Sequence, residues 1–160
     1  MSKFLLVLFA MCVLPAIATA HIAGNGHMFV VRGSVYCDTC RCGYENEATT
    51  YLPGATVKIE CRDKTGQLTY TEEGVTGSNG HYKILVDNDR RDDFCDMVLV
   101  KSSDPECSTP NLGRERARVI LTRNNGMISR FRFANAMGFL KTTPLANCPQ
   151  ILQKYQVSED

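Results

Sequence analysis

Apolar and polar residues alternate strictly along the segment Ala55–Arg62, which reads ATVKIECR. A period of two places every second side chain on the same face of a β-strand. One face of this strand carries the apolar residues Ala55, Val57, Ile59 and Cys61. The dipeptide Pro53-Gly54 before it is typical of a turn. The pattern therefore predicts a half-buried strand that begins after a turn.

Shorter segments of similar character predict further strands, with turn residues about every ten positions between them. These segments are Met28–Tyr36, Gln67–Thr71, Tyr82–Val86, Met97–Lys101, Ala117–Thr122 and Phe131–Leu140. Gly77–Gly80 predicts a tight hairpin, because glycine adopts positive φ at little cost. Helical patterns are nearly absent, apart from one short helical turn expected in Asp87–Asp93 and a terminal helix in Cys148–Tyr155. Six or seven short strands predict an all-β fold, either a sandwich or a barrel.

The first 20 residues have the character of a secretory signal peptide. Lys3 gives a cationic start, Phe4–Leu14 is apolar, and Ala18–Ala20 supplies the small residues of a cleavage site. The run is interrupted by Pro15 and is too short to favour a membrane span, so the alternative is a buried N-terminal strand or helix. We expect cleavage after Ala20, a single domain at residues 21–160 and secretion to the extracellular space.

Removal of residues 1–20 changes the charge and the cysteine count. The whole chain has 18 Lys+Arg and 17 Asp+Glu, so loss of Lys3 leaves 17 of each and a net charge of zero. Neither nucleic acid nor an anionic membrane is expected as a partner, because both select a basic face. Loss of Cys12 reduces eight cysteines to seven. The remaining chain is long enough for one domain with a true apolar core.

Three of the seven cysteines, Cys37, Cys40 and Cys42, fall within six residues. A structural zinc site requires a second cysteine pair or spaced histidines, and a thioredoxin-like site requires a strand-to-helix turn. The sequence offers neither, and a secreted chain favours disulfides. Seven cysteines cannot all pair within one chain, and their spacing does not identify the odd one.

Motifs for catalysis are absent from the sequence. It has no G-x-S-x-G, no H-E-x-x-H and no glycine-rich phosphate loop before a helix. The adjacent acids Glu72-Glu73 and Asp92-Asp93 point to opposite faces of a strand or into solvent, which disfavours a glycosidase pair. We therefore expect no catalytic residue and no cofactor.

Two metal hypotheses are weaker than their alternatives. The acidic segment Asp87–Asp93 lacks the glycine and the terminal glutamate of an EF-hand loop, so a solvated acidic turn is favoured. An N-terminal His21 would chelate copper only with His27 or His81, and the segment Ala23–Gly26 is too glycine-rich for a preorganised site. No metal is expected.

Several motifs resemble the pollen Ole e I and extensin-like family. They are VYCDTCR at Val35–Arg41, LPGATVKIECR at Leu52–Arg62, ARVILT at Ala117–Thr122, ANAMGFL at Ala134–Leu140 and the single cysteines Cys95, Cys107 and Cys148. The resemblance covers Val30–Tyr155, which is nearly the whole mature chain.

The resemblance implies a seven-stranded antiparallel β-barrel or sandwich braced by three disulfides. It implies the pairs Cys37–Cys107, Cys40–Cys148 and Cys61–Cys95. Cys42 is then left over, at a position where the typical family motif has no cysteine. The resemblance thus makes Cys42 the candidate for a free or intermolecular thiol, which would allow a disulfide-linked dimer.

The resemblance also implies a secreted plant protein, a potential pollen allergen, with roles in pollen tube growth and cell-wall contact. We expect a non-enzymatic interaction protein whose partner is a wall polymer or a receptor ectodomain. The alternative is a cell-wall polysaccharide-modifying enzyme with a non-standard site. Basic segments at Arg114–Arg123 and Arg130–Arg132 are suited to acidic pectin, although alternating arginines are more often the wet face of a strand. The sequence has no N-x-[ST] sequon, which predicts no N-linked glycan.

Overall fold

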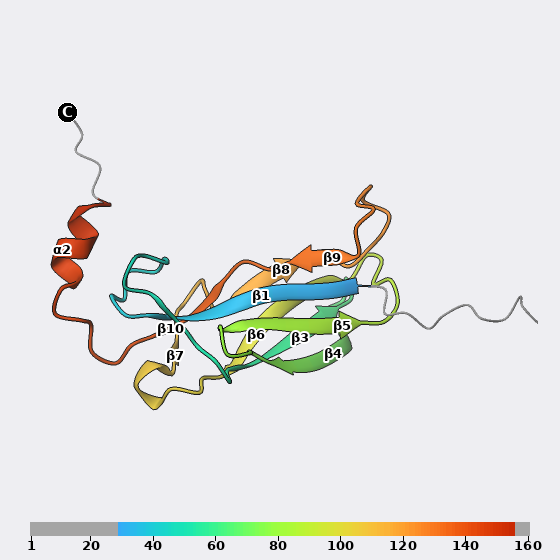
Figure 1. The fold of residues 1–160 in the computed structure, drawn as a ribbon. Helices are drawn as coiled ribbons and strands as arrows, with labels where there is room; N and C mark the ends of the chain where they lie inside the picture. The colour runs from blue at the N-terminus through green and yellow to red at the C-terminus, as the bar shows by residue number, and fades with distance from the viewer. Residues whose placement is uncertain (1–28, 156–160) are drawn as a thin grey trace, which may run out of the picture.

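The computed structural model describes residues 29–155, and the predicted signal peptide, His21 and His27 lie outside this range. The described chain has ten strands, one 3-10 helix and one α-helix (Figure 1). The elements are β1 (Phe29–Asp38), β2 (Thr50–Tyr51), β3 (Thr56–Arg62), β4 (Leu68–Val75), β5 (His81–Val86), β6 (Phe94–Lys101), η1 (Pro105–Cys107), β7 (Thr109–Pro110), β8 (Arg116–Val119), β9 (Phe131–Phe133), β10 (Met137–Leu140) and α2 (Cys148–Gln153). The predicted all-β class is confirmed. No helix in the described range is long and apolar enough to cross a bilayer.

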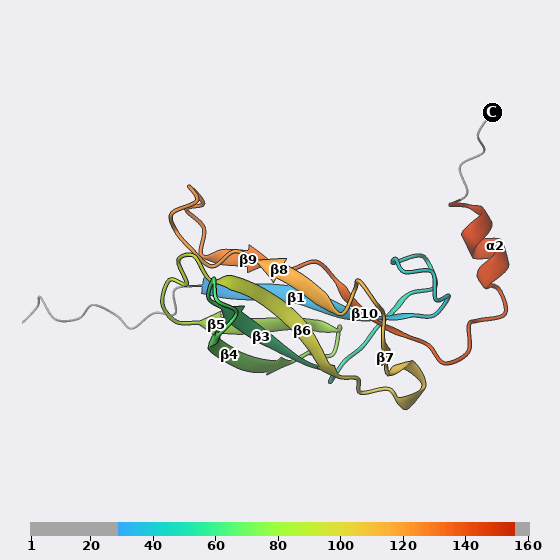
Figure 2. The same ribbon diagram turned by 180° about the vertical axis from the view of Figure 1, so that it is seen from behind.

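The long strand β1 organises the larger of two sheets. Its first half pairs antiparallel with β5 and parallel with β9. Its second half pairs antiparallel with β2 and parallel with β10, which in turn pairs with β7. The second sheet has four antiparallel strands in the order β4-β3-β6-β8 (Figure 2). The described fold thus has ten strands, whereas the resemblance implied seven antiparallel strands. The parallel pairs arise because the chain crosses from β8 in the second sheet to the larger sheet, where β9 and then β10 run alongside β1.

Inward-facing side chains of both sheets meet in one core. Burial alternates strictly along β5, with Tyr82, Ile84 and Val86 inside. On β3, Val57, Ile59 and Cys61 are fully buried, as the alternating sequence predicts. Burial of each large aliphatic side chain contributes about 1.5–3 kcal/mol. The two strands with the clearest period of two therefore supply one wall of the core from each sheet.

The turn at Gly77–Gly80 forms as predicted, but the prediction that its flanking strands form a hairpin is wrong. The N–H of Gly77 donates to the His81 carbonyl at 2.8 Å, and the N–H of Gly80 donates to the Gly77 carbonyl at 2.9 Å. Within the described residues, however, β4 pairs only with β3, and β5 pairs only with β1. The turn therefore carries the chain from one sheet to the other. Turn residues determine where the chain reverses direction, whereas burial of the apolar faces in the core determines which strands pair.

The acidic segment Asp87–Asp93 contains no helical turn, which corrects the expectation from its sequence. Its backbone enters the left-handed region at Asn88, with φ 65°, and at Arg91, with φ 50°, which is incompatible with a right-handed helix. The terminal helix α2 does form inside the predicted range. The predicted strand Phe131–Leu140 is divided into β9 and β10.

Candidate functional site

Three disulfides are present in the described part of the chain. They join Cys37 to Cys107, Cys40 to Cys148 and Cys61 to Cys95. Cys61 and Cys95 face each other directly across the β3–β6 pair. The other two bonds tie the end of β1 to segments 70 and 108 residues further along the chain. The cysteine cluster therefore anchors β1 to η1 and α2.

Cys42 is half-buried and is the one free cysteine among the described residues. Its thiol donates to the Tyr44 carbonyl at 3.3 Å and accepts from Asn46 Nδ2 at 3.2 Å. It also packs against the small apolar cluster that contains Cys40 and Cys148. The loop thus engages this thiol internally, and an intermolecular bond through it stays a prediction.

Asp38, at the end of β1, has a structural role that the sequence analysis missed. Its carboxylate is fully buried and accepts the backbone N–H groups of Cys42 at 3.1 Å and Gly43 at 2.7 Å. It also accepts Asn111 Nδ2 at 3.3 Å. Aspartate side chains often bind the backbone of a nearby turn in this way, so the aspartate between Cys37 and Cys40 was the available signal in the sequence.

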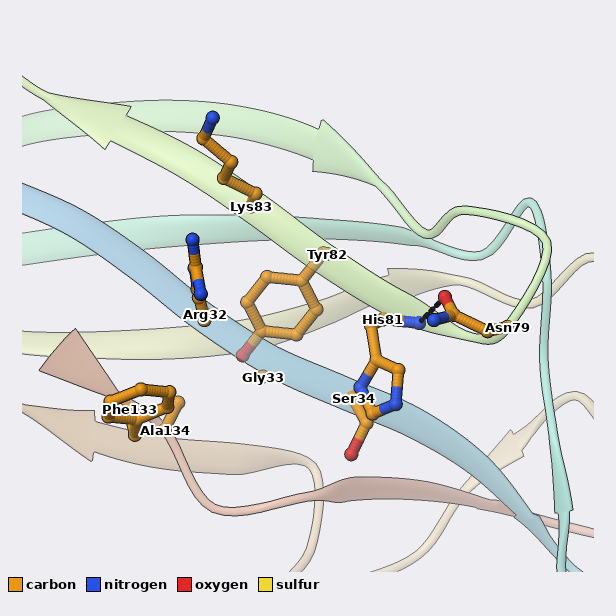
Figure 3. A pocket seen from close by; sticks show the side chains of 9 residues that line it. All are labelled: Arg32, Gly33, Ser34, Asn79, His81, Tyr82, Lys83, Phe133 and Ala134. Atoms are coloured by element: carbon orange, nitrogen blue, oxygen red, sulfur yellow. Dashed lines mark hydrogen bonds between the residues drawn. The ribbon is translucent and has the colours of Figure 1, made fainter. Parts of the chain in front are cut away.

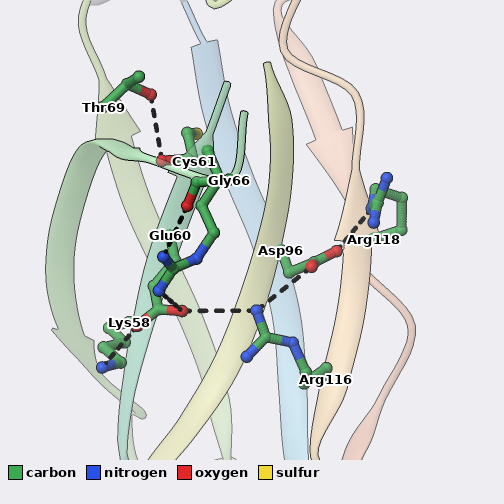
Figure 4. Close-up of polar contacts among 9 residues, drawn as sticks. Lys58, Glu60, Cys61, Gly66, Thr69, Asp96, Arg116 and Arg118 are labelled. Carbon is green, nitrogen blue, oxygen red and sulfur yellow. Dashed lines mark hydrogen bonds and ion pairs between the residues drawn. The ribbon is translucent and has the colours of Figure 1, made fainter. Parts of the chain in front are cut away.

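Strand β8, within the predicted basic segment, faces acids on its own sheet (Figure 4). Arg116 lies 3.3 Å from Asp96 and 3.4 Å from Glu60, and Arg118 Nε lies 2.6 Å from Asp96. Lys58 Nζ lies 2.7 Å from Glu60 on the same strand. The hydrogen bond from Lys58, assisted by Arg116, lowers the pKa of the Glu60 carboxyl. The arginines of β8 are therefore neutralised within the protein.

Arg132, in the second predicted basic segment, is almost completely buried. Its guanidinium donates to the carbonyls of Ile120 at 2.9 Å, Thr122 at 3.1 Å and Phe131 at 3.0 Å, and also to the carbonyl of Ser129. This arginine joins β9 to the segment after β8 and is not exposed to a partner.

The acids of Asp87–Asp93 are occupied by protein groups. Asp89 accepts two backbone N–H groups, Asp92 lies 3.2 Å from Lys64 Nζ, and Asp93 accepts the Thr69 hydroxyl at 2.6 Å. Between residues 29 and 155, no three His, Cys, Asp or Glu side chains are grouped so that they would hold a metal ion.

The candidate binding site lies where β1 changes partners. β1 pairs with β9 up to Arg32 and with β10 from Val35 onwards. Arg32 and Val35 are three positions apart in the sequence, whereas their partners Phe133 and Met137 are four positions apart. The additional residue interrupts the sheet beside Gly33, much as a β-bulge does next to many functional sites. An open pocket of about 570 Å³ lies at this interruption (Figure 3).

The pocket lining is cationic and partly aromatic. It consists of Arg32, Gly33, Ser34, Asn79, His81, Tyr82, Lys83, Phe133 and Ala134. None of these nine residues is acidic. Arg32 and Lys83 are direct neighbours across the β1–β5 pair, and neither forms an ion pair with any residue in the described range. Phe133 is 73% exposed beside them.

Tyr82 lies across β1 at the pocket, with its hydroxyl at Gly33 (Figure 3). A Cβ atom at position 33 would clash with the hydroxyl of the buried Tyr82 ring, so glycine fits here without a shift of that ring. The Tyr82 side chain is only 3% exposed, and its hydroxyl has no hydrogen-bond partner among the described residues. Burial raises the pKa of Tyr82, which keeps the phenol neutral.

The sequence analysis did not assign Arg32, Tyr82, Lys83 or Phe133 to a site, and it considered His81 only as a copper ligand. Alternation correctly placed Tyr82 on an inward face. The pocket itself depends on a change of strand partner, which no local pattern reveals.

These features define a disulfide-braced β-scaffold that carries an open cationic pocket. The chain matches the family described as "Pollen protein Ole e 1 like" over residues 27–156, and it belongs to this family.

Its relatives include a pollen allergen and an anther-specific protein. "Pollen allergen Cro s 1" from Crocus sativus is 45% identical over 96% of this chain and 92% of its own length. "Protein DOWNSTREAM OF FLC" from Arabidopsis thaliana is 42% identical over 99% and 96% of the two chains. "Anther-specific protein LAT52" from Solanum lycopersicum is 37% identical over 96% and 95%. The protein is therefore related to pollen proteins along nearly its whole length.

A solved structure supports the same relationship. The crystal structure of the major plantain pollen allergen Pla l 1 matches with a TM-score of 0.68 and 31% identity. The match covers 75% of this chain and 98% of the plantain chain.

Proposed function

We propose that this protein is a secreted, non-enzymatic binding protein that acts at the plant cell wall during pollen tube growth. Its binding surface is the pocket between β1, β5 and β9, which we name the cationic pocket and define by the nine residues that line it. The observation that carries the proposal is that Arg32 and Lys83 form no ion pair in the described chain, whereas Arg116 and Arg118 are paired with acids of their own sheet.

Secretion is supported by sequence and chemistry together. Residues 1–20 have the pattern of a signal peptide, and the mature domain would then be residues 21–160. Three disulfides suit an oxidising compartment outside the cytosol. Names such as "Anther-specific protein LAT52" support a site of action in male reproductive tissue.

The composition of the pocket favours binding over hydrolysis. Glycoside hydrolysis generally uses two carboxyl groups across the scissile bond. The cationic pocket offers two cations, a hydroxyl, an amide and an imidazole, but no carboxylate. Such a set holds an anionic ligand and lacks the acid–base pair that would cleave a sugar chain.

Retention on isolated primary cell walls tests the proposal. Because the attraction is electrostatic, we expect the mature protein to be retained at low salt and released as salt rises. Arg32→Gln and Lys83→Gln should each reduce the retained fraction several-fold. Lys101→Gln is the matched control, because it removes the same charge from an exposed position on the second sheet. Equal retention of all four proteins would refute the proposed function.

A further inference from the structure

Two cationic side chains lie side by side at the edge of the cationic pocket. Arg32 and Lys83 occupy the same register position on adjacent strands, and Figure 3 shows both side chains extending to the same side. The Arg32 guanidinium is supported by the Phe131 ring, 4.4 Å from its centroid. A guanidinium beside an ammonium, without an acid among the lining residues, is suited to a carboxylate.

The other polar groups of the pocket are suited to hydroxyls. The Tyr82 hydroxyl is not one of them, because it is buried on the core side of β5 and Tyr82 and Lys83 point to opposite faces of the sheet. Ser34 and Asn79 lie around the same hollow. Hydroxyl and amide groups both donate and accept, which matches the hydroxyls of a sugar ring.

Phe133 supplies an exposed aromatic face next to these polar groups. Aromatic faces pack against flat apolar surfaces, such as the C–H face of a pyranose. The pocket volume of about 570 Å³ lies within the range of ligand sites, about 300–1,000 Å³. Because the pocket is open to solvent, one sugar ring of a polymer can occupy it while the rest of the polymer extends beyond it on both sides.

We infer that the cationic pocket binds a uronic acid residue of an acidic polysaccharide, with the carboxylate held between Arg32 and Lys83. The ring stacks on Phe133, and ring hydroxyls bond Ser34 and Asn79. This inference rests on the proposed function and names the ligand of the same site.

An acidic peptide fits this position less well. Extended peptides are usually bound by pairing with a free strand edge. At the pocket, β1 lies between β5 on one side and the β9–β10 path on the other. The site therefore lies inside a sheet, where side chains and not backbone groups make the contacts.

Isothermal titration of the mature protein tests the inference with four probes. They are a short oligogalacturonate, its methyl ester, a neutral galactan oligomer and a poly-glutamate of matched charge. We expect the free acid to bind at least about tenfold more tightly than the other three, because hydrogen bonds to charged groups contribute more than neutral ones. Equal affinity for the ester or for poly-glutamate would overturn the uronate assignment.

Four variants place the ligand in the pocket. Arg32→Gln should weaken oligogalacturonate binding about tenfold, and Phe133→Ala should also weaken it, whereas Lys101→Gln should leave it unchanged. Ser34→Ala should weaken it about two- to tenfold, because it removes a pocket hydroxyl that bonds the ring. If Ser34→Ala and Arg32→Gln both bind like the unaltered protein, the ligand does not occupy this pocket.

Failure of this inference is distinguishable from failure of the proposed function. If wall retention depends on Arg32 but oligogalacturonate does not bind, the proposed function stands and the uronate assignment fails. If oligogalacturonate binds through Arg32 but wall retention ignores that residue, the pocket assignment stands and the wall-binding function fails.

Discussion

Arg132 shows how one side chain replaces a missing strand pairing. β9 pairs with β1 alone in the described fold, and the second sheet ends at β8, so the two sheets are not joined by a backbone ladder at this edge. The Arg132 guanidinium crosses the gap and donates to Ile120 and Thr122 on one side and to Phe131 on the other. It also stacks on the Phe29 ring, 4.7 Å from the centroid. Burial and the neighbouring Arg123 lower the pKa of Arg132, yet arginine remains protonated in proteins.

Arg132→Lys should lower the free energy of unfolding by about 2–3 kcal/mol, because lysine cannot reach carbonyls on both sides and leaves some of them unsatisfied. Urea denaturation followed by far-UV circular dichroism measures this loss. Arg118→Lys is the control, since it makes the same exchange in an exposed ion pair and should cost less than about 1 kcal/mol. Equal losses in the two variants would mean that Arg132 does not join the sheets.

At the scale of elements, the charged row across β3, β6 and β8 makes the second sheet sensitive to acid. Glu60 is largely buried and lies between Lys58 and Arg116, with Asp96 beside it (Figure 4). The pKa of Glu60 is lowered in the folded protein, chiefly by the hydrogen bond from Lys58. A carboxyl group with a lowered folded pKa adds stability above its unfolded pKa, about 4.3 for glutamate, and this stability is lost as the pH falls through the folded pKa.

Glu60→Gln should therefore be less stable than the unaltered protein at neutral pH, and the difference should shrink as the pH falls below about 4.3. Chemical denaturation at a series of pH values measures the difference directly. Glu72→Gln, at an exposed position of strand β4 that is paired with Ile59 and not with Lys58, is the matched control and should cost less stability at neutral pH than Glu60→Gln. A Glu60→Gln difference that grows toward acid pH would contradict the assigned direction of the pKa shift.

The elements that the sequence predicted are those whose signal is local. The alternation of Ala55–Arg62 and Tyr82–Val86 identified β3 and β5, because each has one wet and one buried face. β2 and β7 were missed because each strand has only two residues, which is too short for an alternating pattern to be recognised. The predicted hairpin at Gly77–Gly80 was wrong because the glycines indicate a turn, and a turn alone does not determine whether β4 pairs with β5.

The candidate site was not predictable for a related reason. The cationic pocket combines residues of β1, β5 and the end of β9, which lie far apart in the sequence. Arg32 and Lys83 were unremarkable in the sequence, whereas the arginine-rich segments that drew attention are paired or buried. Only the register of β1 with its neighbours identifies which cations lack acidic partners.

At the scale of the whole molecule, α2 lies beyond the end of β1, outside the two sheets (Figure 1). It is held by the Cys40–Cys148 disulfide and by a small cluster that includes Ile151 and Leu152. The other four bonded cysteines belong to the main core. The three disulfides therefore have two different roles, since two lie in the core and one attaches a peripheral helix.

The double substitution Cys40→Ser/Cys148→Ser should release α2 while the sheets stay folded. Few other buried contacts hold the helix, so we expect the amides of residues 148–153 to lose most of their protection against hydrogen exchange. Amides of β3, in the middle of the second sheet, should remain the slowest to exchange. Cys42→Ser removes a neighbouring thiol but no disulfide, so it should leave the protection of α2 almost unchanged. If the double substitution exposed β3 as strongly as α2, this disulfide would be part of the main cooperative unit, and α2 would not be an independently opening element.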